Sequence, residues 1–194
     1  MKTFNSLIGI FIACLLTAGV HLYAAGTDDW IVLFDGTDLE NWTTTGEVNW
    51  NIDGNVVQAD TGSGMLVTRQ RYGDFQLKLE FWADEKTNSG VFIRCSGTED
   101  ITPASCYEVN IFDTRPDQSF RTGAIVDVSP PASVINTEGR WNTYEIIAHG
   151  THMKIILNGT TTVDAHDDRL GEGHIALQYA AGGIKFRNVR IRDL

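Results

Sequence analysis

Residues 74–83 read Asp-Phe-Gln-Leu-Lys-Leu-Glu-Phe-Trp-Ala, and the strict alternation of apolar and polar side chains here decides the fold class. In an extended strand, successive side chains point to opposite faces. One face would then carry Phe75, Leu77, Leu79 and Phe81, and the other Gln76, Lys78, Glu80 and Trp82. A helix would instead repeat its apolar residues every three or four positions. We therefore predict a strand with one face in a core and the other in water.

Stretches of similar length and pattern occur along the whole chain. We predict further strands at residues 31–34, 48–52, 56–59, 64–68, 89–95, 106–112, 124–128, 141–149, 153–157, 160–165, 174–179 and 184–192. The dipeptides Asp53-Gly54 and Asn158-Gly159 accept positive φ and close tight turns between strands. About a dozen short strands joined by such turns predict an all-β fold, a two-sheet antiparallel β-sandwich.

The first 25 residues have the pattern of a secretory signal peptide. Lys2 is their one charged residue, residues 7–20 are an apolar run, and Ala24 and Ala25 are small residues suited to a cleavage site. We predict a leader over residues 1–25, one domain over residues 26–194, and a secreted or periplasmic location. An apolar run of 14 residues is shorter than the roughly 20 that a membrane-spanning helix needs, so no integral span is expected. The alternative is lipidation at Cys14, because Ile12-Ala13-Cys14 partly matches a lipobox.

Charge and cysteine content narrow the classes of partner and compartment. Once Lys2 is removed with the leader, 14 of the 15 basic residues remain against 25 acidic ones, a formal charge of −11. An acidic surface argues against nucleic acid or an anionic membrane as partner. Cys95 and Cys106 are an even pair in a chain sent to an oxidising compartment, so we expect a disulfide between them. The alternative is two buried free thiols.

The same alternation predicts where polar side chains gather. In residues 89–95, Val91 and Ile93 would point to the core and Arg94 to the opposite face. If the strands concerned are neighbours in one sheet, a single surface would carry Lys78, Glu80, Trp82, Arg94, Glu108, Asn110, Gln178 and Arg187. Aromatic rings cover the apolar faces of sugars, while charged and amide groups bind their hydroxyls, so this mixture favours a carbohydrate partner. The alternative for each residue is an ordinary solvated face with cross-strand ion pairs.

Several strings of residues, in order, are similar to those of a known family. They are Leu33-Phe34-Asp35-Gly36, Asn41-Trp42, Asn88-Ser89-Gly90-Val91-Phe92-Ile93-Arg94, Tyr107-Glu108-Val109-Asn110-Ile111-Phe112-Asp113, Thr122-Gly123-Ala124, Arg140-Trp141-Asn142, Leu157-Asn158-Gly159, Gly173-His174-Ile175-Ala176-Leu177-Gln178 and Phe186-Arg187-Asn188-Val189-Arg190-Ile191. From about Trp30 to Leu194 the chain resembles the 3-keto-disaccharide hydrolase domain family, which implies a concanavalin A-like jelly roll. Two positions depart from the family's pattern. Asn110 stands where many members have Gln, and residues 179–182 lack the members' His-Gly.

The resemblance implies a hydrolase or lyase that acts on 3-keto-glycosides by C2 proton abstraction, elimination and rehydration. On this interpretation Glu108 is the base, and Arg94 with Arg187 stabilises the enolate. The residues expected to bind and orient substrate are Glu80, Trp82, Asn110, Asp113 and Gln178. Two alternatives stay open: a noncatalytic carbohydrate-binding module of the cell envelope, and a structural or interaction domain.

No cofactor or metal ligand is predicted from the sequence. Glu108 and Asp113 have the oxygen ligands that suit a divalent cation, but no dedicated cation loop is present. The histidines and cysteines also lack the spacing of a zinc site.

Overall fold

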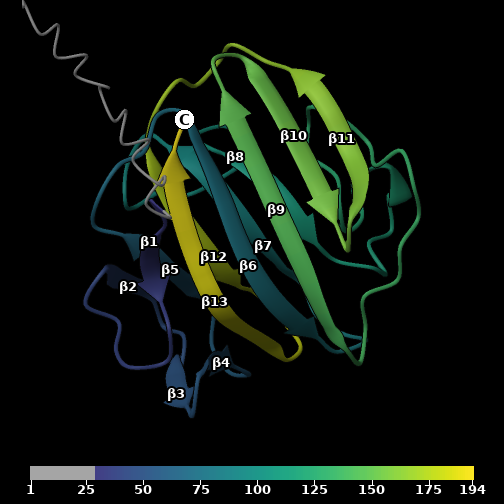
Figure 1. Cartoon of the computed structure of the whole chain (residues 1–194). Coiled ribbons are helices and arrows are strands. Elements are labelled where there is room, and N and C mark those ends of the chain that lie inside the picture. The colour runs from purple at the N-terminus through teal and green to yellow at the C-terminus, as the bar shows by residue number, and fades with distance from the viewer. Residues whose placement is uncertain (1–28) are drawn as a thin grey trace, which may run out of the picture.

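A computed structural model describes residues 29–194 as two β-sheets packed face to face (Figure 1). Every pair of neighbouring strands in the sheets is antiparallel. The prediction of an all-β, two-sheet antiparallel sandwich is confirmed. The predicted leader over residues 1–25 and the alternative of lipidation at Cys14 lie outside the described residues.

The larger sheet, in front in Figure 1, has eight strands. Its order is β11 (Thr160–His166), β10 (His152–Leu157), β9 (Trp141–His149), β6 (Phe75–Ala83), β13 (Ile184–Asp193), β4 (Val56–Ala59) and β3 (Asn51–Asp53). The eighth strand, β1 (Ile31–Phe34), pairs with the last part of β13, while β4 pairs with its first part. Strand β6 therefore lies inside the sheet, between β9 and β13, with its apolar face toward the core and its polar face toward solvent.

The smaller sheet lies behind it and has five strands. Its order is β2 (Trp42–Gly46), β5 (Gly64–Thr68), β12 (His174–Tyr179), β7 (Ser89–Cys95) and β8 (Tyr107–Ile111). A long connection that contains a short 3₁₀ helix, Gln118–Phe120, joins β8 to β9. Part of this connection follows the free edge of β8, where Ile125 forms an isolated antiparallel bridge with Val109.

The main core lies between the two sheets. Phe75, Leu77, Leu79 and Phe81 of β6 all contribute to it, as predicted. A second, smaller cluster lies on the outer side of the smaller sheet, where Phe92, Val67 and Ala176 pack under the loop that carries Ile101. This loop runs from Cys95 to Cys106, which form a disulfide, so the predicted pairing is present. The disulfide closes this loop and holds it over the outer side of the smaller sheet.

Two β-bulges change which way side chains point. In β7 the register against β12 shifts where Arg94 has a φ of 54°, and in β13 the register against β6 shifts where Asn188 has a φ of 53°. An extra residue in one strand interrupts the strict alternation of faces. Two of the predicted site residues are affected: Arg94 lies in the first bulge and Arg187 directly precedes the second.

Most predicted strands are present, with three differences. Strand β2 was not predicted, because Thr43-Thr44-Thr45 lacks apolar alternation. The strand predicted at residues 48–52 is restricted to Asn51–Asp53. The strand predicted at 124–128 is wrong, because Asp127 has a φ of 61° and the chain turns there, with Val128 N and Ser129 N donating to Ile125 O. The Asn158-Gly159 turn has positive φ at both residues and joins β10 to β11 as expected.

Candidate functional site

The residues predicted to share one surface are divided between the two sheets. Lys78, Glu80, Trp82 and Arg187 belong to β6 and β13 of the larger sheet. Arg94, Glu108, Asn110 and Gln178 belong to β7, β8 and β12 of the smaller sheet. The prediction of a single surface is therefore wrong. Alternation within a strand shows which residues share a face, but it does not show which strands are neighbours.

Arg94 does not lie beside Glu108, contrary to the prediction. Its side chain is fully buried, and its guanidinium donates to the carbonyl oxygens of Gly73, Gly150 and Leu170. Its Nη2 also lies 2.9 Å from Oδ1 of Asp74. The bulge at Arg94 is the reason, because it removes this residue from the alternation that would have placed it outward. Arg94 joins loops at the end of the sandwich and is not available to a substrate.

Arg187 and Glu80 form a closed group on the outer face of the larger sheet. Arg187 donates through Nε and Nη2 to Oε2 of Glu80, at 2.9 and 2.7 Å, and Asn188 Nδ2 donates to Oε1 at 2.6 Å. The ring of Trp141 lies 3.9 Å from the Arg187 guanidinium carbon, and Lys185 Nζ lies 5.2 Å from the ring centre of Trp82. The predicted roles of Arg187, Glu80 and Trp82 at the Glu108 site do not fit these positions.

Glu108 lies on the outer face of the smaller sheet, close to a glycine, Gly90, and to an amide residue, Asn110. In the ladder of β7 and β8, Glu108 pairs with Phe92, and Asn110 pairs with Gly90. A Cβ atom at Gly90 would lie 3.3 Å from Cγ and from Oε1 of Glu108. The missing side chain of Gly90 therefore makes room for the Glu108 carboxyl to lie against the sheet.

Glu108 is only 6% exposed, and its carboxyl has an unusual acidity. Burial raises its pKa to about 7, with Asp127 adding to the rise and the positive charge of Arg115 opposing it. A carboxyl that titrates near neutral pH can both accept and return a proton under mild conditions, which is the property of a general base. The role of Glu108 as the base stays a prediction, and its raised pKa is compatible with that role.

Two amide oxygens near Glu108 have unused hydrogen-bonding capacity. Asn110 is fully buried, and its Nδ2 donates a hydrogen bond to the carbonyl oxygen of Phe120. This hydrogen bond fixes which end of the side-chain amide is the nitrogen, so the end without a partner is the oxygen, Oδ1. Neither this Oδ1 nor Oε1 of Gln178 finds a hydrogen-bond partner among residues 29–194. Gln178 lies one strand beyond Gly90, because β12 pairs with β7. Buried acceptors without partners are costly, so these two oxygens suit a ligand that brings hydroxyl donors.

Asp113 has a different position from the one predicted. It accepts hydrogen bonds from the backbone N–H and from Oγ1 of Thr137, and its Oδ1 lies 3.6 Å from Nη2 of Arg121. Both carboxylate oxygens are engaged in this way. Asp113 therefore anchors the connection between β8 and β9 to the chain just before β9.

Sequence reasoning missed two residues of this site. Gly90 could have been noticed, because a glycine inside a buried strand often marks a close approach. Arg115 could not be recognised from the sequence, because it lies in an irregular loop that has no periodic pattern of apolar and polar residues. Its ring partner is Phe120, whose centre lies 5.8 Å from the Arg115 guanidinium carbon.

Within residues 29–194, no three histidine, cysteine or acidic side chains are grouped so that they would hold a metal ion. No helix in this part of the chain has the length and hydrophobicity required to span a bilayer.

Comparison with known proteins identifies the family. The family model described as the 3-keto-alpha-glucoside-1,2-lyase-like domain matches residues 29–192. The chain belongs to this family. The resemblance carried by the sequence motifs is thereby confirmed, and Glu108, Asn110 and Gln178 all lie inside the matched range of the lyase-like domain.

Solved structures give the same answer about the fold of this lyase-like domain. A candidate glycosyl hydrolase from Parabacteroides distasonis ATCC 8503 is 29% identical, with a TM-score of 0.74 over 85% of this chain and 99% of its own. A second one from the same organism is 20% identical, with a TM-score of 0.73 over 86% of this chain and 94% of its own. The carbohydrate-binding module CBM66 from Bacillus subtilis is 20% identical, with a TM-score of 0.58, and covers 77% of this chain and 93% of its own. At 20% identity these last two show a shared fold alone.

None of the curated proteins matches the sequence at a significant level. Family and neighbours together place the lyase-like domain among glycosyl hydrolase-like proteins with a jelly-roll sandwich.

Proposed function

We propose that this lyase-like domain cleaves glycosides whose C3 hydroxyl has been oxidised to a ketone, with Glu108 as the base. The observation that carries the proposal is the buried Glu108 carboxyl, whose pKa is raised to about 7, beside two unpartnered amide oxygens. A weak base is sufficient here, because a ketone at C3 acidifies the proton at C2.

The proposed reaction has two stages. Glu108 takes the C2 proton, and the C–H electron pair forms an enolate with the C3 oxygen. The enolate electrons then re-form the C3 carbonyl and make a double bond between C1 and C2, while the C1–O bond breaks and the leaving oxygen takes up a proton. Water adds to C1 in the second stage, with a proton returned to C2, and this gives the free 3-keto sugar.

Arg115 replaces Arg94 as the cation of this scheme. It is the positive charge that acts on the Glu108 carboxyl, and it lies in the loop that leaves β8. A cation there would stabilise the negative charge that develops on the enolate oxygen. Gln178, which is partly exposed, would accept a hydrogen bond from a substrate hydroxyl through its free oxygen and so orient the sugar ring. The fully buried Asn110 would hold the connection after β8 through its hydrogen bond to Phe120.

Turnover of an aryl 3-keto-glucoside by the purified protein tests this proposal. We expect release of the aryl group by the wild-type protein, and a loss of about a hundredfold or more in Glu108→Gln. Lys86→Gln, which removes one exposed charge from the turn between β6 and β7, serves as the matched control and should retain full turnover. Saturable binding of the 3-keto-glucoside without turnover would reject the catalytic proposal and identify a noncatalytic carbohydrate-binding domain.

We also propose that the protein is exported, with residues 1–25 removed. The disulfide between Cys95 and Cys106 supports export, because such bonds persist in oxidising compartments. The intact mass of the protein from its native cells checks this. A product that begins near Gly26 agrees with the proposal, and a product that retains Met1 or begins at a lipidated Cys14 contradicts it.

A further inference from the structure

The outer face of the larger sheet collects cations in a chain that is acidic as a whole. On the outward positions of β6, β9, β10, β11 and β13 there are six cations and three carboxylates. The cations are Lys78, Lys154, Lys185, Arg187, Arg190 and Arg192, and the carboxylates are Glu80, Glu145 and Asp164. This excess has the opposite sign to the net charge of −10 of the whole chain.

Three of these cations are held in place by one aromatic ring. Lys78 Nζ, the Arg190 guanidinium and the Arg192 guanidinium lie 5.3, 5.2 and 5.0 Å from the ring centre of Trp30. Cation–π contacts of this kind hold a charge in position while its N–H groups stay free to donate. The Arg190 guanidinium is exposed and makes no hydrogen bond or ion pair with any residue between 29 and 194. It is thus a positioned donor whose N–H groups are not used by any hydrogen bond within residues 29–194.

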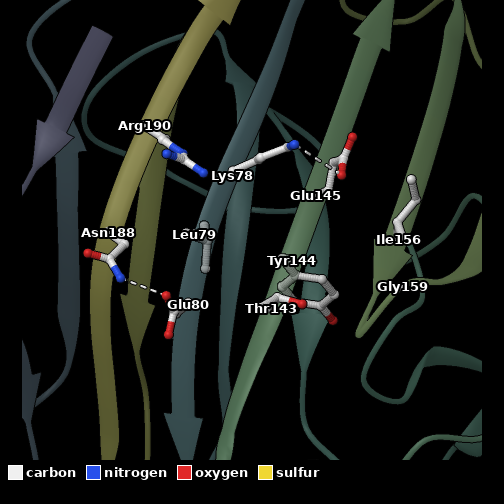
Figure 2. A pocket seen from close by; sticks show the side chains of 10 residues that line it. All are labelled: Lys78, Leu79, Glu80, Thr143, Tyr144, Glu145, Ile156, Gly159, Asn188 and Arg190. Atoms are coloured by element: carbon white, nitrogen blue, oxygen red, sulfur yellow. Dashed lines mark hydrogen bonds and ion pairs between the residues drawn. The ribbon is translucent and has the colours of Figure 1, made fainter. Parts of the chain in front are cut away.

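Arg190 stands between two hollows of this face. One, of about 300 Å³, has Lys78, Thr143 and Glu145 in its wall, and the other, of about 340 Å³, has Val32 and Asp35. Both hollows share Glu80, Asn188 and Arg190. In Figure 2 the Arg190 side chain extends toward β6, and the Lys78 side chain extends from β6 in the same direction, toward Glu145 of β9, with its Nζ 3.5 Å from Oε2 of Glu145.

The chemistry of this lining points to a ligand with both anionic and hydroxyl groups. Arg190 and Lys78 offer donors to an anion, whereas Glu80 and Glu145 offer only acceptors when ionised. Phosphate esters and the headgroups of acidic lipids would supply few hydroxyl donors to those carboxylates. A uronic acid has a carboxylate for the cations and hydroxyls for the acidic and amide groups. Two adjoining hollows suit successive units of such a sugar chain.

We propose that the outer face of the larger sheet is a second carbohydrate site, which binds a uronic-acid unit of an acidic glycan through Arg190 and Lys78. The site lies on the opposite outer face of the sandwich from Glu108. It rests on the proposed function only in taking the ligand to be a sugar. Such a site would hold the domain on an acidic polysaccharide while the smaller sheet handles its own substrate.

Calorimetric titration with an oligogalacturonate tests the site, and the same oligosaccharide with its carboxyls reduced to alcohols is the neutral comparison. We expect the acidic form to bind and the neutral form to bind at least about tenfold more weakly, because the reduced sugar lacks the charge that would accept hydrogen bonds from Arg190 and Lys78. Raising the salt concentration from about 0.05 to about 0.5 M should weaken binding of the acidic form alone. Equal binding of both forms would overturn the proposal.

Variants locate the site on the molecule. Arg190→Gln and Lys78→Gln should each weaken binding of the oligogalacturonate about tenfold, whereas Lys86→Gln removes one exposed charge from the β6–β7 turn and should have no effect. Glu108→Gln should bind the acidic form as the wild type does, even if it has lost turnover. Unchanged binding by Arg190→Gln, loss of binding by Glu108→Gln, or binding only to vesicles of acidic lipid would each overturn the proposal.

Discussion

The carboxyl group of Glu108 lies directly over Gly90 of the neighbouring strand, so that a Cβ atom at Gly90 would stand 3.3 Å from Oε1 of Glu108. This contact links the acidity of the carboxyl to the sequence of the adjacent strand. Burial raises the pKa of Glu108, and a side chain at position 90 would crowd the carboxyl in its buried position.

Gly90→Ala should separate activity from stability. Gly90 has no positive φ, so alanine fits its backbone, and replacing a glycine inside a strand can stabilise it by roughly 0.5–1 kcal/mol. The new methyl group would displace the Glu108 carboxyl toward solvent and lower its pKa. We expect an unchanged or slightly higher melting temperature together with reduced turnover and an acid limb of the pH profile shifted to lower pH. A large loss of stability would show that the strand itself cannot accept a side chain there.

Stability should fall as pH rises, through the titration of Glu108. Its pKa is about 7 in the folded protein and near its ordinary value of 4.5 in the unfolded chain, so the folded state holds the extra proton between these two values. Ionisation of Glu108 therefore costs roughly 3 kcal/mol by pH 8. Glu108→Gln should remove this dependence, and urea unfolding at several pH values between about 4.5 and 8 measures it. If the wild type and the variant show the same slope of unfolding free energy against pH, the burial of Glu108 is misjudged.

Arg94 should be a stability residue with no separate effect on substrate. Its buried guanidinium donates to three carbonyl oxygens and pairs with Asp74. Arg94→Met should cost roughly 3 kcal/mol or more in denaturant unfolding, because those acceptors lose their donor. The exposed Arg190→Gln should change the free energy of unfolding by less than about 0.5 kcal/mol. If Arg94→Met were as stable as the wild type but had no turnover, the result would contradict this prediction and indicate a catalytic role for Arg94.

The disulfide should stabilise both the chain and the loop over the smaller sheet. Replacing Cys95 and Cys106 together by alanine should cost about 2–3 kcal/mol, the value expected for closing a loop of this length. The loop that carries Ile101 should then protect Phe92 and its neighbours less well. Hydrogen exchange of the amides of β7, compared with those of β6 as the internal reference, measures this effect. Identical exchange in both proteins would show that the loop packs without its disulfide.

The fold could be predicted from the sequence more fully than the site could. Alternation in residues 74–83 placed Phe75 and Phe81 in the core, and Asn158-Gly159 fixed a turn, because both signals are local. The arrangement of strands depends on long-range pairing, which no local pattern encodes, and so the proposed single surface was wrong.

The bulge in β7 explains the error at Arg94. The inserted residue at Arg94 redirects a guanidinium that strict alternation places outward. Glu108 keeps its predicted face because no bulge interrupts the pairing of β7 with β8 along Ser89 to Ile93. The high pKa of Glu108 comes from its burial, with a further rise from Asp127 and an opposing effect of Arg115, and the proximity of these loop residues to Glu108 cannot be read from the local sequence pattern.

Exchange of the C2 proton of a 3-keto-glucoside in D2O, followed by NMR, tests the role of Glu108 most directly. The wild-type protein should catalyse exchange or loss of that proton near neutral pH, and Glu108→Gln should do so at least about a hundredfold more slowly while still binding the sugar. If the two proteins labelled C2 at the same rate, Glu108 would not be the base.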